Sequence, residues 1–530
     1  MKKRLIKLVT FFIILLNSST LFGLSTRAKN DPFPIFSADW PTYIWLLDKT
    51  LLNFKECGDL YTKSCIKPKV CTPCSSRVER DSHCSLAFSG FYQKANCGRN
   101  YDREKVALGD LEGRWHMLGM CYGPVPNAVP GLTGAPVFPT TLENKQLGIA
   151  KEALFPPITA DEIVPADRIL TDSSREVGFF SVPTHYRKHG VRFEFAFQPH
   201  VDFGILVQGS YADIKNTATQ FINLTPFCGC QTDCNGLPVD YLVSAPQFTC
   251  NEVNLINAYL MSSTSANKIF REQGIETRSN TQNRCDFRVS GFEDLRFFVW
   301  FRHIFQLNQL SCDWPELALI PFFNIEGSVS PTRKVDRASA LAVPLGNDGH
   351  SSIGFSGGFH IDFYDTVQIS FNGGATYFSA KNVNDYRLPT HETQSGVFPF
   401  STAVRLKPGQ NHQFEVILRA YRFIGKLSGF ASFVVVNHAE DSIKILNEKV
   451  RNATVIIPNT QADPNAGESV PVFRVKQAEC YTKFMSQFLT TAGSYEISPN
   501  VTLGFAVQWP IQQRNAFRST TVIGTIRGTF

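Results

Sequence analysis

The C-terminal stretch from Val501 to Phe530 alternates between two kinds of side chain in two runs. Every odd position from Val501 to Trp509 is apolar, and the residues between them are small or uncharged. A mixed linker, residues 510–516, leads to a second run whose even positions from 522 to 530 share one face. Successive side chains of a β-strand point to opposite faces, so this period of two predicts two strands.

The same alternation recurs along the chain from residue 177. The runs cover 191–198, 201–211, 295–301, 353–363, 367–377, 398–406, 414–420 and 427–436. Most of them reach the ~9–11 residues with which a tilted strand crosses a bilayer. We expect about twelve strands. Residues 438–498 are either one long connection or hide one or two more, for example near Leu489–Ile497, which extends the range to fourteen.

The connections between these runs alternate in length. Short ones (198–200, 364–366 and 408–411) mostly alternate with long ones (213–285, 329–350 and 379–395). This asymmetry is typical of outer-membrane β-barrels, in which the short turns face the periplasm.

The second face of the runs separates a barrel from a secreted β-sandwich. A sandwich would expose long charged side chains to water. Here the second face is mostly small and polar, as in Ser352, Gly354 and Ser356 or Ser370, Asn372 and Gly374. Small polar residues suit a crowded barrel interior, and an aromatic-rich outer face suits lipid. The pattern therefore predicts an all-β, transmembrane, antiparallel up-and-down β-barrel, residues 176–530.

Two parts of the chain carry a family resemblance, the C-terminal segment and three segments between 291 and 349. The ending Ile523-Gly-Thr-Ile-Arg-Gly-Thr-Phe530 resembles the C-terminal signature of bacterial outer-membrane β-barrels, with Gly528 where that signature has a large residue. Segments 291–296, 317–327 and 343–349 resemble elements of outer-membrane channels for small, often aromatic or hydrophobic compounds, with Glu293 in place of a usual Gly. The resemblance implies a channel whose last strand pairs with its first, and a barrel-assembly machinery that engages the strand ending at Phe530.

The amino end reads as a cleaved signal peptide, residues 1–23. Lys2, Lys3, Arg4 and Lys7 precede an apolar core, Leu8–Leu16, which is too short for the ~20 residues of a spanning helix. Its removal takes away four basic and no acidic residues, so the net charge of +6 becomes +2. We therefore expect export to the bacterial outer membrane and no nucleic-acid partner. Charged residues are only 18%, below the ~25% of soluble domains, which fits a wall between lipid and water.

Residues 24–175 form a segment rich in Cys and Pro, which we interpret as periplasmic or as a plug of the barrel. The chain has 14 Cys, and at this density in an exported protein they predict disulfides. The candidates are Cys57, Cys65, Cys71, Cys74, Cys84, Cys97, Cys121, Cys228, Cys230, Cys234, Cys250 and Cys285. Odd counts in the two clusters leave bridges between clusters, bridges between chains and free thiols open. Cys71-Thr-Pro-Cys74 has neither a following His for haem nor a second such pair for zinc, so we expect no metal and no cofactor.

Charged residues of the runs fall on the face opposite the lipid. Arg or Lys at mid-depth on the lipid face would cost ~2–4 kcal/mol each. The candidates for lining a pore are Arg192, Glu194, Arg296, Arg302, His360, Asp362, Arg405, Glu415 and Arg419. As a hypothesis, Arg296, Arg302, Arg405 and Arg419 give a mild anion preference. Satisfied interior salt bridges with no role in transport are the alternative for each residue.

We predict a channel for passive passage of small solutes, with outer-membrane lipid and those solutes as partners and a homo-oligomer left open. One alternative is a structural or adhesive surface protein cross-linked through its Cys-rich loops. An outer-membrane enzyme is the other. His360 and Asp362 share a face near Ser352, Ser356 and Ser370, but strands rich in Ser produce such coincidences easily, so we expect no enzymatic activity.

Overall fold

The computed structural model describes only part of the chain, and every structural statement below concerns that part. The described residues are 84–111, 113–116, 179–200, 202–218, 222–224, 286–303, 305–306, 317–329, 341–363, 367–390, 396, 398, 400–424, 426–459, 463–480, 482–498 and 500–530. The predicted signal peptide, most of segment 24–175 and most of the long loop 213–285 lie outside them.

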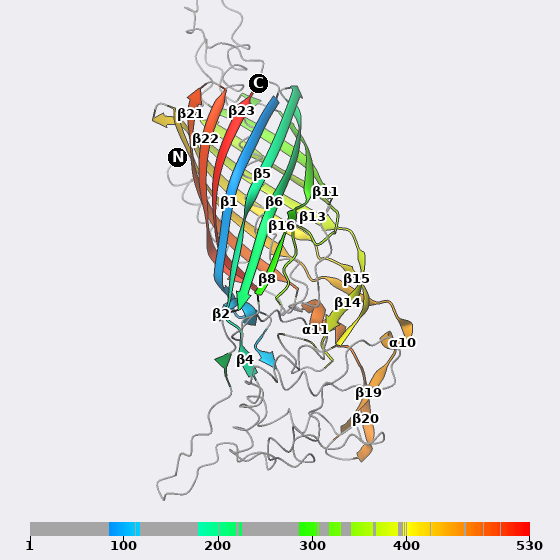
Figure 1. The fold of residues 1–530 in the computed structure, drawn as a ribbon. Coiled ribbons are helices and arrows are strands. Elements are labelled where there is room, and N and C mark those ends of the chain that lie inside the picture. The colour runs from blue at the N-terminus through cyan, green and yellow to red at the C-terminus, as the bar shows by residue number, and fades with distance from the viewer. Residues whose placement is uncertain are drawn as a thin grey trace, which may run out of the picture.

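Twelve strands form one closed antiparallel barrel (Figure 1). In chain order they are β1 (Cys84–Arg99), β5 (Thr184–His200), β6 (Phe203–Ala218), β8 (Asp286–Phe292) continued by β9 (Leu295–Arg302), β11 (Leu317–Val329), β12 (Ser352–Phe363), β13 (Val367–Phe378), β16 (Asn411–Ile424), β17 (Leu427–His438), β21 (Phe484–Ser498), β22 (Val501–Arg514) and β23 (Ala516–Thr529). Each strand pairs with the next one in the chain, and β10 (Phe305–Gln306) adds two residues beside β11. The predicted fold class and strand number are confirmed.

The last strand closes the barrel on the first, as the C-terminal sequence predicts. β23 pairs with β1 from Ser85↔Thr529 to Arg99↔Ala516. The pairing continues to the last residue, because the backbone N–H and carbonyl groups of Cys84 and Phe530 exchange two hydrogen bonds of 3.0 Å. Phe530 is therefore held in the wall.

Side chains alternate between the two faces of the wall. The outward positions carry exposed apolar residues, among them Phe88, Phe195, Phe301, Phe355, Phe505 and Trp509. The inward positions carry buried polar residues, among them Ser89, Gln208, Ser356, Asn372, Thr490 and Gln508. Because the outer phenylalanines are exposed, they are not packed against a second sheet, which excludes the β-sandwich. No helix in the described part of the chain has the length and apolar character needed to cross a membrane.

The barrel begins earlier in the chain than the sequence predicts. Strand β1 lies inside segment 24–175, although we placed the start of the barrel at residue 176. Most of its inward residues are small or polar (Ser85, Ala87, Ser89), and its two Cys made it look like part of a disulfide-rich loop. The strand predicted near Leu489–Ile497 does exist, as part of β21.

Two predicted connections were wrong. Residues 408–411 are not a barrel turn, because β15 (Phe400–Lys407) pairs with β14 (Lys381–Leu388) and β18 (Ser442–Ile445) while β16 pairs with β13. Residues 510–516 are not a linker either, because both strands extend until only Asn515 separates them, with a positive φ of 53°.

The two ends of the barrel differ. At the short-turn end, residues 201–202, 364–366, 425–426 and 499–500 connect neighbouring strands, and the chain terminus lies beside them (Figure 1). At the long-loop end the connections are long, except at Asn515, and several fold into ordered structure.

Two of these long connections combine into a small module beyond the barrel, which we call the loop module (379–410 and 439–483; Figure 1). It contains the β14-β15-β18 sheet, the helices α10 (Glu448–Arg451) and α11 (Val475–Cys480), and the hairpin of β19 (Thr454–Asn459) and β20 (Asp463–Pro471). Residues from both connections share one apolar core, made by Val383, Tyr386, Leu388, Val404, Leu406, Ile443, Ile445, Val450, Val472, Phe473 and Ala478. Burial of this surface holds the two connections together.

Buried polar contacts join the loop module to the barrel. The Asp441 carboxylate lies 2.9 Å from Nε2 of His438, the last residue of β17, and within the module it accepts a hydrogen bond of 2.8 Å from Gly409 N–H. In the module itself, Arg387 donates to the carbonyl of Phe398 at 3.1 Å. Burial lowers the pKa of Arg387 to about 10 against the opposing effect of Asp385, so its guanidinium stays charged at neutral pH.

Candidate functional site

The barrel interior gathers the charged residues that the sequence assigned to it. Eight of the nine pore-lining candidates have buried side chains at inward positions of the wall: Arg192, Glu194, Arg296, Arg302, His360, Asp362, Glu415 and Arg419. They come from β5, β9, β12 and β16, so strands on several sides contribute.

The ninth candidate, Arg405, is not in the interior. It lies on β15, in the loop module, and is exposed. Val404 and Leu406 beside it are buried in the core of that module. The alternation that suggested a membrane strand is therefore real, but a protein core covers its apolar face.

Towards the short-turn end, His360 and Ser370 form a buried polar cluster on β12 and β13. The two residues are cross-strand partners, and His360 Nδ1 lies 2.6 Å from Ser370 Oγ. Gln368 accepts a hydrogen bond of 3.0 Å from Arg419, and the ring of Phe322 stacks on His360 with centroids 4.5 Å apart. Ser370 is completely buried, so this contact does not present a nucleophile to solvent.

A second charged cluster surrounds the break between β8 and β9. Glu293 and Asp294 form the break between the end of β8 at Phe292 and the start of β9 at Leu295, and both side chains are buried. Glu293 receives Lys188 Nζ at 2.7 Å and Ser210 Oγ at 2.6 Å. Lys188 is fully buried, so this ion pair is desolvated and well partnered, which is the condition under which a buried charge is tolerated.

The Arg192 guanidinium lies beside this cluster, 4.2 Å from the centroid of the Phe91 ring. An aromatic face attracts a cation at this distance, so Phe91 helps to hold the arginine in the interior.

Residues 341–350, which we call the mouth loop, fold inward at the long-loop end. Val343 and Leu345 are buried in a cluster with inward residues of the wall such as Phe91 and Ile214, and Leu341 is buried as well. The loop therefore fills part of the interior.

Polar contacts fix the mouth loop in this position. Asn347 N–H donates to Asp294 at 3.1 Å, and its side chain donates to Ser328 at 3.2 Å. Asn216 donates to the carbonyl of Leu341 at 3.1 Å, so the loop is bound at both ends. Positive φ angles at Gly346 (56°) and Asp348 (48°), on either side of Asn347, form the turn there.

Several of these residues had no predicted role. Lys188 was missed because the predicted strand began at Val191, whereas β5 begins at Thr184. Extending the alternation of β5 backwards would have put Lys188 on the inward face. Asp294 and the mouth loop lie in the segments that resemble channel elements, but nothing in the sequence showed that they meet.

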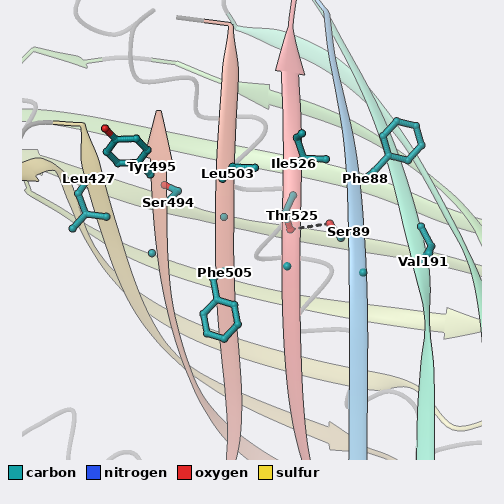
Figure 2. A pocket seen from close by; sticks show the side chains of 14 residues that line it. Phe88, Ser89, Val191, Leu427, Ser494, Tyr495, Leu503, Phe505, Thr525 and Ile526 are labelled. Carbon is teal, nitrogen blue, oxygen red and sulfur yellow. Dashed lines mark hydrogen bonds between the residues drawn. The ribbon is translucent and has the colours of Figure 1, made fainter. Parts of the chain in front are cut away.

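An apolar hollow of about 780 Å³ lies in the outer wall where β23 meets β1. A Cβ on Gly90 or Gly524 would meet nothing within 4 Å, so these two glycines leave the space open. Figure 2 shows Phe88, Leu503 and Ile526 around it, with the 2.9 Å hydrogen bond between Ser89 and Thr525 joining the strands. The hollow faces outward, so it is not part of the interior.

Two of the twelve disulfide candidates lie in the described residues, and both are free. Cys84 and Cys97 stand near opposite ends of β1, so they cannot bridge each other. Disulfide formation by the twelve candidates therefore stays a prediction. The other ten candidates lie outside the described residues.

Comparison with known proteins finds likeness in fold only. No protein-family profile and no curated protein matches the chain. Among solved structures, an outer-membrane channel from Pseudomonas putida F1 is 7% identical with a TM-score of 0.38, covering 87% of this chain and all (100%) of that one. The toluene transporter TbuX of Ralstonia pickettii is 7% identical with a TM-score of 0.30, covering 85% of this chain and 90% of that one. The translocator domain of the autotransporter NalP of Neisseria meningitidis is 6% identical with a TM-score of 0.26, covering 94% and 99%. These TM-scores are too low to support an inference about function, so the function proposed below is argued from this chain alone.

Proposed function

We propose that this protein is a channel of the bacterial outer membrane through which small solutes pass passively. One observation carries the proposal: a closed twelve-stranded wall has apolar side chains outside and charged side chains inside. Backbone groups in lipid must be hydrogen-bonded within the protein, and a closed barrel of strands meets this requirement. An interior with charges on several strands is what a hydrated path requires, and a soluble barrel has no need of an aromatic exterior.

The difference between the ends supports an orientation. Short turns and the C-terminus of an outer-membrane barrel face the periplasm, and long loops face outward. The proposal accordingly places the loop module outside the cell. It also includes export by a cleaved signal peptide and insertion by a barrel-assembly machinery that engages β23. It assigns no enzymatic reaction.

Passage requires a conformational change in this account. The charged interior residues are buried, and the mouth loop packs on the wall above them. Solute can pass only when the groups that cover these residues move. We therefore propose a channel with a closed ground state, in which release of the mouth loop opens the path.

The test is conductance and ion selectivity in planar bilayers, together with swelling of liposomes by uncharged solutes, with and without reductant. Arg296, Arg302 and Arg419 face the interior, so replacing all three by Gln should shift the reversal potential towards cations. Arg405→Gln is the control, because one charge of the same kind is lost outside the barrel, and it should leave the reversal potential unchanged. Absence of both conductance and swelling from membrane-inserted protein would refute the channel.

A further inference from the structure

Three cations share the solvent face of the β14-β15-β18 sheet. They are Arg405 and Lys407 on β15 and Lys444 on β18, and all three are exposed. Their neighbours Val404, Leu406, Ile443 and Ile445 are buried in the core of the loop module. Because alternate residues of a strand point to opposite faces, burial of these four puts the three cations on one side. We call this surface the basic face.

The cations of the basic face repel one another. Arg405 and Lys444 are direct cross-strand partners, and like charges in that arrangement destabilise a sheet. Asn382 on β14 is the other cross-strand partner of Arg405, and Ser442 on β18 is the cross-strand partner of Lys407. Both are exposed and uncharged.

Two other cations of the loop module are neutralised by ion pairs. Arg451 pairs with Glu448 at 3.1 Å, and Lys476 pairs with Glu479 at 2.9 Å. In the described part of the chain, no ion pair or hydrogen bond involves the side chains of Arg405, Lys407 or Lys444. The three positive charges of the basic face are thus not neutralised by an ion pair with a described residue.

The basic face lies close to the end of the barrel. Lys407 is four residues from Asn411, the first residue of β16, so the two Cα atoms are at most about 14 Å apart. Lys444 is six residues beyond His438, the last residue of β17, which limits that distance to about 22 Å. If the barrel crosses the outer membrane as proposed, these limits keep the cations within reach of the head groups at the outer end of the barrel.

We propose that the basic face binds phosphate groups on the head groups of outer-leaflet lipids. A guanidinium binds phosphate through two parallel hydrogen bonds, and lysine ammonium groups add charge. Asn382 and Ser442 supply further donors on the same surface. A bound phosphate would also relieve the repulsion between Arg405 and Lys444. This inference rests on the proposed membrane position of the barrel, and it adds a lipid partner to it.

The test measures binding of the full-length protein in detergent to micelles that contain lipid A carrying its phosphates. The patch variant R405Q/K407Q/K444Q should bind about a hundred-fold more weakly, since each cation near an anionic surface contributes about five-fold. The control variant K449Q/R451Q/K476Q removes the same charge from the same module, and it should change the affinity less than about three-fold.

Folding is checked by the heat-dependent mobility of the barrel on gels and by the melting temperature. The patch variant should be at least as stable as the parent, because it loses the Arg405–Lys444 repulsion. If the triple variant does not fold, the single variants R405Q and K444Q decide, each with an expected loss of about five-fold.

Three outcomes would overturn the inference. They are parental affinity of the patch variant, an equal loss in the control variant, and equally tight binding of dephosphorylated lipid A or of a soluble acidic polysaccharide. The channel is tested separately, because a patch variant that conducts but loses lipid leaves it intact, and a parent that binds lipid but never conducts refutes only the channel.

Discussion

At the scale of single residues, two glycines of the wall differ in the space around them. A Cβ on Gly358, in β12, would collide with the carbonyl oxygen of Phe371 on the neighbouring strand. A Cβ on Gly524, in β23, would meet nothing within 4 Å, because it points into the outer hollow. The close approach of the neighbouring backbone therefore requires glycine at position 358 but not at position 524.

The expected result is that Gly358→Ala folds poorly and Gly524→Ala folds like the parent. Overpacking of this kind costs about 1–3 kcal/mol or more, whereas a methyl group in an open hollow costs nothing comparable. The yield of refolded barrel, measured by heat-dependent gel mobility, gives the comparison. Equal yields for the two variants would contradict the assigned packing.

The inward charged residues show how far a single position can be predicted. Arg192, Glu194 and Glu415 were placed correctly because alternation fixes the face once the strand is recognised. Their partners could not be predicted in the same way. The contact between Lys188 and Glu293 joins β5 to the break after β8 and depends on a register that only the folded wall defines.

At the scale of elements, β15 marks the limit of the periodicity argument. A period of two shows that one face of a strand is covered, but lipid and a protein core produce the same alternation. Val404 and Leu406 are covered by the loop module, whereas Leu503 and Phe505 are exposed on the barrel. The difference arises from the contacts between two distant connections, 379–410 and 439–483.

The mouth loop is the element on which opening should depend. Asp294→Ala removes the acceptor of the 3.1 Å hydrogen bond from Asn347, so the loop should leave its closed position more often. We expect a higher open probability in single-channel records. Asp213→Ala is the control, since Asp213 bonds Arg288 at 2.9 Å and makes no contact with the mouth loop among those described. Identical gating of the parent and both variants would refute the role of the loop.

At the scale of the whole molecule, the architecture was predictable because many strands repeat one rule. Alternation and strand length both indicated a barrel, and β23 does close it by pairing with β1. The loop module and the early start of the barrel were not predictable. β1 looked like part of a Cys-rich segment, and the module has a core only after two separate connections come together.

The central claim is that lipid lies outside the wall and not inside it. Trp509 points outward with 40% of its side chain exposed, and Trp300 points inward with 2% exposed. Two variants that each retain one of these as the only tryptophan, with Phe at the other tryptophan positions, can be reconstituted in bilayers of lipids brominated in the acyl chain. Bromine quenches fluorescence on contact, so the account predicts strong quenching of Trp509 and little of Trp300. Equal quenching of the two, or stronger quenching of Trp300, would contradict it.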